Sequence, residues 1–210
     1  RLIHFSYELV ELKGIRMRGR MGRYITLDEL LDEAKRRVME LLEGREGIEE
    51  EEVEEISEKV AIGAVRYALV SVAPSKKVVF SWERVLNLEE NSGPFIQYSY
   101  TRARSILRKA GSIPEEFDPS LLTSELELTL VYKIAELPEI IRRSVELMRP
   151  DLLAQYANEL ASDFNRFYES CPVLRATPEL RNARLALVEC FSIAMGNTLR
   201  LLGIPRLEKM

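Results

Sequence analysis

The sequence predicts a mainly α-helical protein in which a helix bundle follows a smaller α/β region. Two observations support this fold class. From residue 94 onward, apolar residues recur at helical spacing between capping residues, glycines and prolines, whereas only residues 2–12 and 77–82 have the pattern of strands. The chain has 210 residues, of which 46% are hydrophobic, so it is long and apolar enough to bury a core.

The chain opens with a predicted strand, a loop and a helix. Residues 2–12 alternate roughly as a strand, and residues 13–24 form a loop rich in Arg and Gly. Thr26 and Glu29 have the spacing of a capping box. The apolar residues after them repeat at helical spacing until Gly44, which predicts an amphipathic helix.

A second helix and a second strand complete the α/β region. The acidic run 49–55 reads as the solvated start of a helix, which Pro74 closes. Residues 77–82, KVVFSW, are β-branched and aromatic and predict a strand. A polar loop then leads to Gly93.

The rest of the chain predicts a bundle of four to six helices. Ser124 with Glu127 forms a second capping box, and Thr177 with Pro178 marks another helix start. The expected helices cover residues 94–109, 124 onward with a kink or division at Pro138, 151–169, and 178–202.

Composition narrows the classes of function. The net charge is −4, and residues 95–210 hold fifteen basic and fifteen acidic side chains, so any nucleic-acid contact must come from a local patch. No membrane span, signal peptide or metal-binding spacing is present, which predicts a cytoplasmic protein without a metal site. Cys171 and Cys190 are expected to be buried thiols.

Residues 91–109, NSGPFIQYSYTRARSILRK, combine aromatic and basic side chains on one predicted helix. Aromatic rings stack on splayed bases and cations hold phosphates, which is what binding of a single-stranded RNA loop requires. The alternative for Phe95 and Tyr98 is packing of this helix onto its neighbours. For Arg104, Arg108 and Lys109 the alternative is plain solvation. Trp82 and Tyr67 are assigned to packing.

The run GPFIQYSYTR fits the pattern G-P-[YF]-x-Q-Y-x-x-x-R and resembles the start of the anticodon-binding (DALR-type) domain of arginyl-tRNA synthetases. The closing residues, from Ala186 to Met210, resemble the end of the same enzymes. The segment GIRMRGRMGRYITLDELLDEA resembles their ATP-binding signature loop, although Met21 stands where the catalytic lysine is usual. The HIGH-type motif of the family is absent from this chain.

The resemblance implies roles for individual residues. The residues expected around the anticodon loop are Phe95, Tyr98, Arg102, Tyr168, Asn197 and Met210. For Arg102 and Asn197 a structural cap or salt bridge is an equal alternative. A phosphate role in the signature-like loop would fall to Arg16, Arg18 or Arg20, and no complete catalytic set is expected.

The resemblance also implies how the chain is divided into domains and which reaction the parent enzyme carries out. Residues 1–25 would end a class I catalytic domain, residues 26–93 would form a connecting, stem-contact region, and residues 94–210 the all-helical anticodon-binding domain. The parent enzyme would be a monomer that ligates arginine to tRNA-Arg with ATP and Mg, through an aminoacyl-adenylate. The alternatives are a free-standing, non-catalytic RNA-binding or protein-interaction module and a purely structural helical domain. Because the chain begins with Arg1 in mid-pattern, it is expected to be the C-terminal part of a longer protein.

Overall fold

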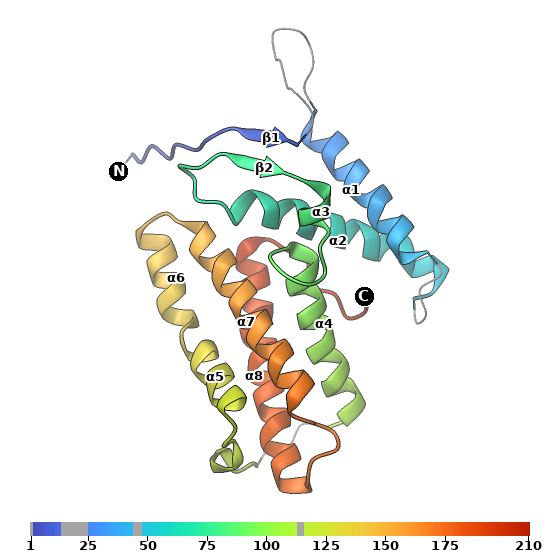
Figure 1. Cartoon of the computed structure of the whole chain (residues 1–210), viewed down its shortest axis with the longest axis vertical. Coiled ribbons are helices and arrows are strands. Elements are labelled where there is room, and N and C mark those ends of the chain that lie inside the picture. The colour runs from blue at the N-terminus through green and yellow to red at the C-terminus, as the bar shows by residue number, and fades with distance from the viewer. Residues whose placement is uncertain (1, 14–24, 44–47, 113–115) are drawn as a thin grey trace.

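A computed structural model describes residues 2–13, 25–43, 48–112 and 116–210, and it arranges a helix bundle beneath a smaller α/β layer (Figure 1). The mainly α fold class is confirmed. The elements are β1 (Val10–Leu12), α1 (Leu27–Leu42), α2 (Glu50–Val70), β2 (Val78–Phe80), α3 (Trp82–Val85), α4 (Gly93–Ala110), the 3-10 helix η2 (Pro119–Leu121), α5 (Glu125–Ala135), α6 (Leu137–Glu146), α7 (Pro150–Ser170) and α8 (Pro178–Leu202).

The bundle is built around α8, which packs on α4, α5 and α7. Its largest buried side chains include Phe191, Met195 and Leu199, and they meet Phe164 and Phe167 of α7 in one continuous core. Helix α8 is long and apolar enough to cross a membrane by composition, but 67% of that stretch is buried inside the bundle. Its apolar character is therefore explained by its central position.

The two cysteines differ in their surroundings. Cys171 is buried at the end of α7, as expected, whereas Cys190 lies on an exposed position of α8. The expectation of a buried thiol is therefore wrong for Cys190. Successive residues of an α-helix point in different directions. The side chains of Val188 and Phe191 therefore face the core, while that of Cys190 faces outward.

The α/β layer consists of the α1–α2 hairpin and a two-stranded parallel sheet across one end of the bundle (Figure 1). Val10 pairs with Val78, and Leu12 with Phe80. The strand predicted over residues 2–12 is shorter than expected, because among the described residues only β2 pairs with it and residues 2–9 are all exposed. Trp82 was expected at the end of the second strand and residues 83–85 in a polar loop, but together they form the short helix α3.

A close crossing of α2 and α4 joins the two layers. Gly63 of α2 and Gly93 of α4 meet there, and a Cβ on Gly93 would lie 2.2 Å from the carbonyl oxygen of Gly63. Only hydrogen fits in this space, so the glycine of the NSGPF segment permits backbone contact. The crossing also brings the start of α4 against the middle of α2.

Both predicted capping boxes are present. Thr26 accepts a hydrogen bond from the Glu29 N–H at 3.2 Å, and its own N–H donates to the Glu29 carboxylate at 2.7 Å. In the second box, the Ser124 N–H donates to Glu127 at 2.8 Å. Pro138 divides the predicted helix into α5 and α6 and occupies the first turn of α6.

Thr26→Ala is expected to lower the free energy of unfolding by about 1 kcal/mol, because it leaves an N–H of the first turn without its side-chain acceptor. Denaturant unfolding of the variant and of Thr26→Ser measures the effect. Thr26→Ser keeps the hydroxyl and should unfold near the wild-type midpoint. Equal midpoints for Thr26→Ala and the wild type would contradict the cap.

Candidate nucleic-acid interface

Helix α4 begins and ends as its local sequence requires. Ser92 is the N-cap and accepts a backbone hydrogen bond at 3.0 Å, and Pro94 occupies the first turn. Gly111 closes the helix with a φ of 79°. Between these ends, Tyr98 and Arg102 lie one turn apart on the same face. Both are half-buried.

The Arg102 guanidinium lies between two tyrosine rings. Its carbon is 4.7 Å from the centroid of Tyr98 on α4 and 4.7 Å from that of Tyr168 on α7. It donates to the Tyr98 hydroxyl at 3.1 Å and to Asn165 Oδ1 at 3.1 Å. The Asn165 amide in turn donates to Ser99 at 3.0 Å. Cation-π contact and hydrogen bonds therefore hold this group, which we name the Arg102 stack, in one geometry.

Tyr168 continues an aromatic column from the core to the surface. Phe191 and Phe164 stack at 3.8 Å with an interplanar angle of 8°, and Phe164 lies 6.5 Å from Tyr168 at 25°. Phe191 and Phe164 are buried, whereas Tyr168 is 41% exposed. The core thus supports Tyr168 from one side and leaves part of its ring open to a ligand.

Two open clefts flank the Arg102 stack. The tail cleft has a volume of about 300 Å³ and lies beside the C-terminal residues; the loop cleft has a volume of about 430 Å³ and lies beside the α7–α8 loop. Both share Arg102, Ser105 and Tyr168. The tail cleft is also lined by Ile48, Tyr98, Thr101, Arg108, Glu208, Lys209 and Met210. The loop cleft is also lined by Ile106, Lys109, Glu169, Pro172, Val173, Leu174 and Arg175.

Charged side chains surround both clefts. Arg104 and Arg108 lie 3.3 Å and 3.9 Å from the Glu208 carboxylate. Lys209 lies 2.9 Å from Glu52, and its hydrogen bond lowers the pKa of that carboxyl. All of these pairs are well exposed, so they contribute little to stability, and their cations can exchange a carboxylate for a phosphate.

The family described as "DALR anticodon binding domain" matches residues 96–210, more than half of the chain. The chain belongs to this family. The family described as "tRNA synthetases class I (R), catalytic domain" matches residues 1–82. The resemblance predicted from the GPFIQYSYTR run and the closing residues is confirmed.

Curated relatives and solved structures agree with the family match. The arginine-tRNA ligases of Korarchaeum cryptofilum and Ignicoccus hospitalis are 60% and 48% identical, each over 100% of this chain. The chain spans 33% of the length of each. The arginyl-tRNA synthetase of Thermus thermophilus has a TM-score of 0.89 at 35% identity, over 97% of this chain and 35% of that one. The Plasmodium falciparum enzyme has a TM-score of 0.73 at 26% identity, over 89% and 34%.

The DALR domain brings together four of the residues predicted to contact RNA. Tyr98, Arg102, Tyr168 and Met210 all line the tail cleft, although three different elements supply them. Met210 is half-buried and packs against the apolar residues at the end of the α1–α2 hairpin. These four side chains provide rings, a cation and a flexible apolar group at one surface.

Two other predicted residues lie elsewhere in the DALR domain. Phe95 is only 4% exposed and belongs to the bundle core, because the N-terminal turn of α4 is buried under α2 and α7. In this conformation its ring cannot stack on a base, so the packing alternative is favoured. Asn197 is exposed on α8 but lines neither cleft. The predicted phosphate residues Arg16, Arg18 and Arg20 lie outside the described residues.

Sequence reasoning did not identify Asn165 or the tail residue Lys209. Asn165 lies one turn before Tyr168 on α7 and orients Arg102. The sequence feature that could have pointed to Asn165 is its place as a polar residue beside the apolar stripe of α7. Lys209 comes from a segment with no helical or strand period, so no pattern could place it beside α4.

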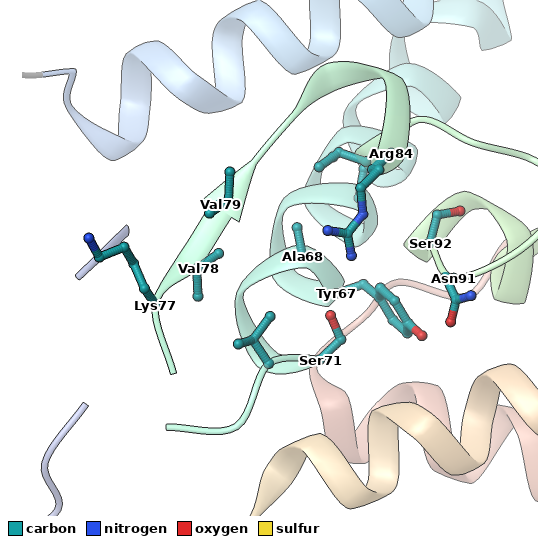
Figure 2. Close-up of a pocket in the computed structure, with 12 residues that line it drawn as sticks. Tyr67, Ala68, Ser71, Lys77, Val78, Val79, Arg84, Asn91 and Ser92 are labelled. Atoms are coloured by element: carbon teal, nitrogen blue, oxygen red, sulfur yellow. The ribbon is translucent and has the colours of Figure 1, made fainter. Parts of the chain in front are cut away.

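A smaller cavity lies in the α/β layer. Its volume is about 140 Å³, and Figure 2 shows Arg84 directed toward Tyr67, with Ser71, Asn91 and Ser92 nearby. Tyr67 is 3% exposed and donates to the Ala154 carbonyl at 3.4 Å, and burial raises the pKa of its hydroxyl. The packing role predicted for Tyr67 agrees with this position. Trp82 packs edge-on against Phe80 at 5.0 Å, as its predicted packing role requires.

Proposed function

We propose that the Arg102 stack and its two clefts bind the anticodon loop of tRNA-Arg, and that this chain is the RNA-binding part of an arginine-tRNA ligase. The observation that carries the proposal is the Arg102 stack itself. A cation held between two partly exposed tyrosines lies at the surface of a DALR domain, and the relatives named above are arginine-tRNA ligases.

The geometry of the stack suits unpaired nucleotides. An extruded base can stack on the exposed part of a tyrosine ring, and such a contact is worth about 1 to 3 kcal/mol. Arg102 uses N–H groups on two of its nitrogens for Asn165 and Tyr98, and its remaining N–H groups can donate to a base edge or a phosphate. Met210 adds an apolar, adaptable side chain to the lining of the tail cleft.

The loop cleft would take the neighbouring nucleotide of the same loop. Lys109 and Arg175 supply cations to its lining, and Val173 and Leu174 supply apolar surface. Because the two clefts share Tyr168, successive nucleotides would both lie next to the exposed part of this ring. Lys and Arg contacts to phosphates position an RNA, while contacts to base edges select it.

The chain would be one part of an enzyme that carries out the whole ligation reaction. The parent enzyme would ligate arginine to tRNA-Arg with ATP and Mg through an aminoacyl-adenylate, as a cytoplasmic monomer. Residues 1–25 would belong to its catalytic domain, with Arg16, Arg18 or Arg20 available to ATP phosphates, and residues 26–93 would connect that domain to the RNA-binding bundle at residues 94–210. The chain would supply RNA binding and no complete catalytic set.

Nuclease protection of a tRNA-Arg transcript tests the proposed site. With the 210-residue chain bound, we expect protection of the anticodon loop and unchanged cleavage at the acceptor end. A tRNA with a different anticodon is the control and should show weaker protection of its loop at the same concentration. No protection at saturating protein would contradict the proposal and favour the purely structural alternative. Protection spread evenly along the transcript would also contradict it, because it would show electrostatic binding without a defined site.

A further inference from the structure

The last residues of the chain follow α4 in a defined register. The tail, residues 203–210, leaves the end of α8, passes behind α4 and ends beside it (Figure 1). Pro205 O accepts a hydrogen bond from Gln97 at 2.9 Å, and Leu207 O accepts one from Thr101 at 3.1 Å. These donors lie one turn apart, so α4 guides the tail along its own axis.

Gln97 holds this tail from inside the protein. It is fully buried, and its Nε2 donates both to Pro205 O and to Lys59 O of α2, the latter at 3.1 Å. Both amide hydrogens are therefore used. A Cβ on Gly63 would lie 2.4 Å from Gln97 Oε1, so the absence of a side chain on α2 makes room for the amide. Gln97 thus joins three segments at one point.

The tail ends in the tail cleft. Leu207 is 3% exposed and packs among Val38, Leu42, Ile56 and Val60 of the α1–α2 hairpin. Beyond Leu207, Met210 packs against the same cluster and lines the cleft beside Tyr98. The position of Met210 therefore depends on where the preceding residues are anchored.

We infer that Gln97 is a positioning residue for RNA binding, acting through the tail to place Met210 beside the Arg102 stack. The inference rests on the proposed function. Gln97 does not reach either cleft, so its effect on RNA passes through the bond to Pro205. Gly203 and Ile204 stay bound to Arg66 and α8, so loss of the Gln97 bond frees the backbone at Pro205 and Arg206. This part of the tail must then be ordered when RNA binds, which lowers affinity.

Gln97→Met keeps the length of the side chain and removes both donors. We expect carboxypeptidase to release Met210 about tenfold faster, and affinity for a tRNA-Arg transcript to fall about tenfold, as the loss of one or two buried hydrogen bonds would produce. In a chain lacking Met210, the same substitution should change affinity less than about twofold. This non-additivity separates an effect through the tail from general loss of stability.

Thr198→Val is the matched control. Thr198 is also fully buried, but its hydroxyl donates within α8 to Ala194 rather than to the tail. Thr198→Val should leave the release of Met210 unchanged.

Unchanged release in Gln97→Met, or an equal loss of affinity with and without Met210, would overturn the inference. If the wild-type chain does not bind the transcript, the proposed function fails, and the release rate alone decides whether Gln97 holds the tail.

Discussion

Tyr168→Ala is expected to lower the affinity of the chain for a tRNA-Arg transcript about ten- to a hundredfold. Removing the ring deletes a stacking surface worth about 1 to 3 kcal/mol and one of the two aromatic walls that hold the Arg102 guanidinium. The ring is 41% exposed, so its loss should leave the core intact. Equilibrium binding by filter retention or fluorescence anisotropy measures the change.

Tyr132→Ala is the control for this substitution. Tyr132 is 69% exposed on α5 and lines neither cleft, so the same change of chemistry there should leave RNA affinity unaltered. Both variants should keep the circular dichroism spectrum of the wild type. Equal affinities for Tyr168→Ala and the wild type would show that the Arg102 stack does not contact RNA.

Gly93→Ala is expected to destabilise the chain by about 3 kcal/mol. The added Cβ would lie 2.2 Å from the backbone of Gly63, and backbone cannot move aside as a flexible side chain can. Helices α2 and α4 would have to separate, which also disturbs the slot that Gln97 occupies. Chemical denaturation measures the loss, and RNA affinity should fall with it even under conditions where the variant stays folded.

Gly196→Ala provides the comparison. Gly196 is also buried in a helix, but a Cβ there would meet the edge of the Tyr100 ring at 3.2 Å, a side-chain contact that needs a shift of only a few tenths of an ångström. The gain in helix propensity, about 1 kcal/mol, offsets the crowding. A loss of stability at Gly196 equal to that at Gly93 would mean that backbone contact between α2 and α4 is not the cause.

Helix positions were the most predictable part of the fold, because capping chemistry is local. Thr26 and Ser124 each cap the helix that their neighbours predict. Strand length was not predictable in the same way. Residues 2–9 have the alternation of a strand, but a strand also needs a partner, and β2 is only three residues long.

The site was predictable in part. Tyr98 and Arg102 share a helix face by their spacing alone, whereas Tyr168 lies 66 residues beyond Arg102 and was placed only through the family resemblance. Whether Phe95 faces the core or the surface depends on which neighbours cover α4, and only the packing of the bundle decides that. The tail was least predictable, because its path depends on hydrogen bonds from Gln97 and Thr101 rather than on any period.

The ratio of affinities for two transcripts across a salt series tests the central claim most directly. One transcript is tRNA-Arg, and the other is the same tRNA with the anticodon bases exchanged. We expect both affinities to fall as salt rises, because phosphate contacts are screened, while the ratio in favour of tRNA-Arg persists, because stacking and base-edge contacts depend less on salt. A ratio near one at every salt concentration would contradict an anticodon site at the Arg102 stack.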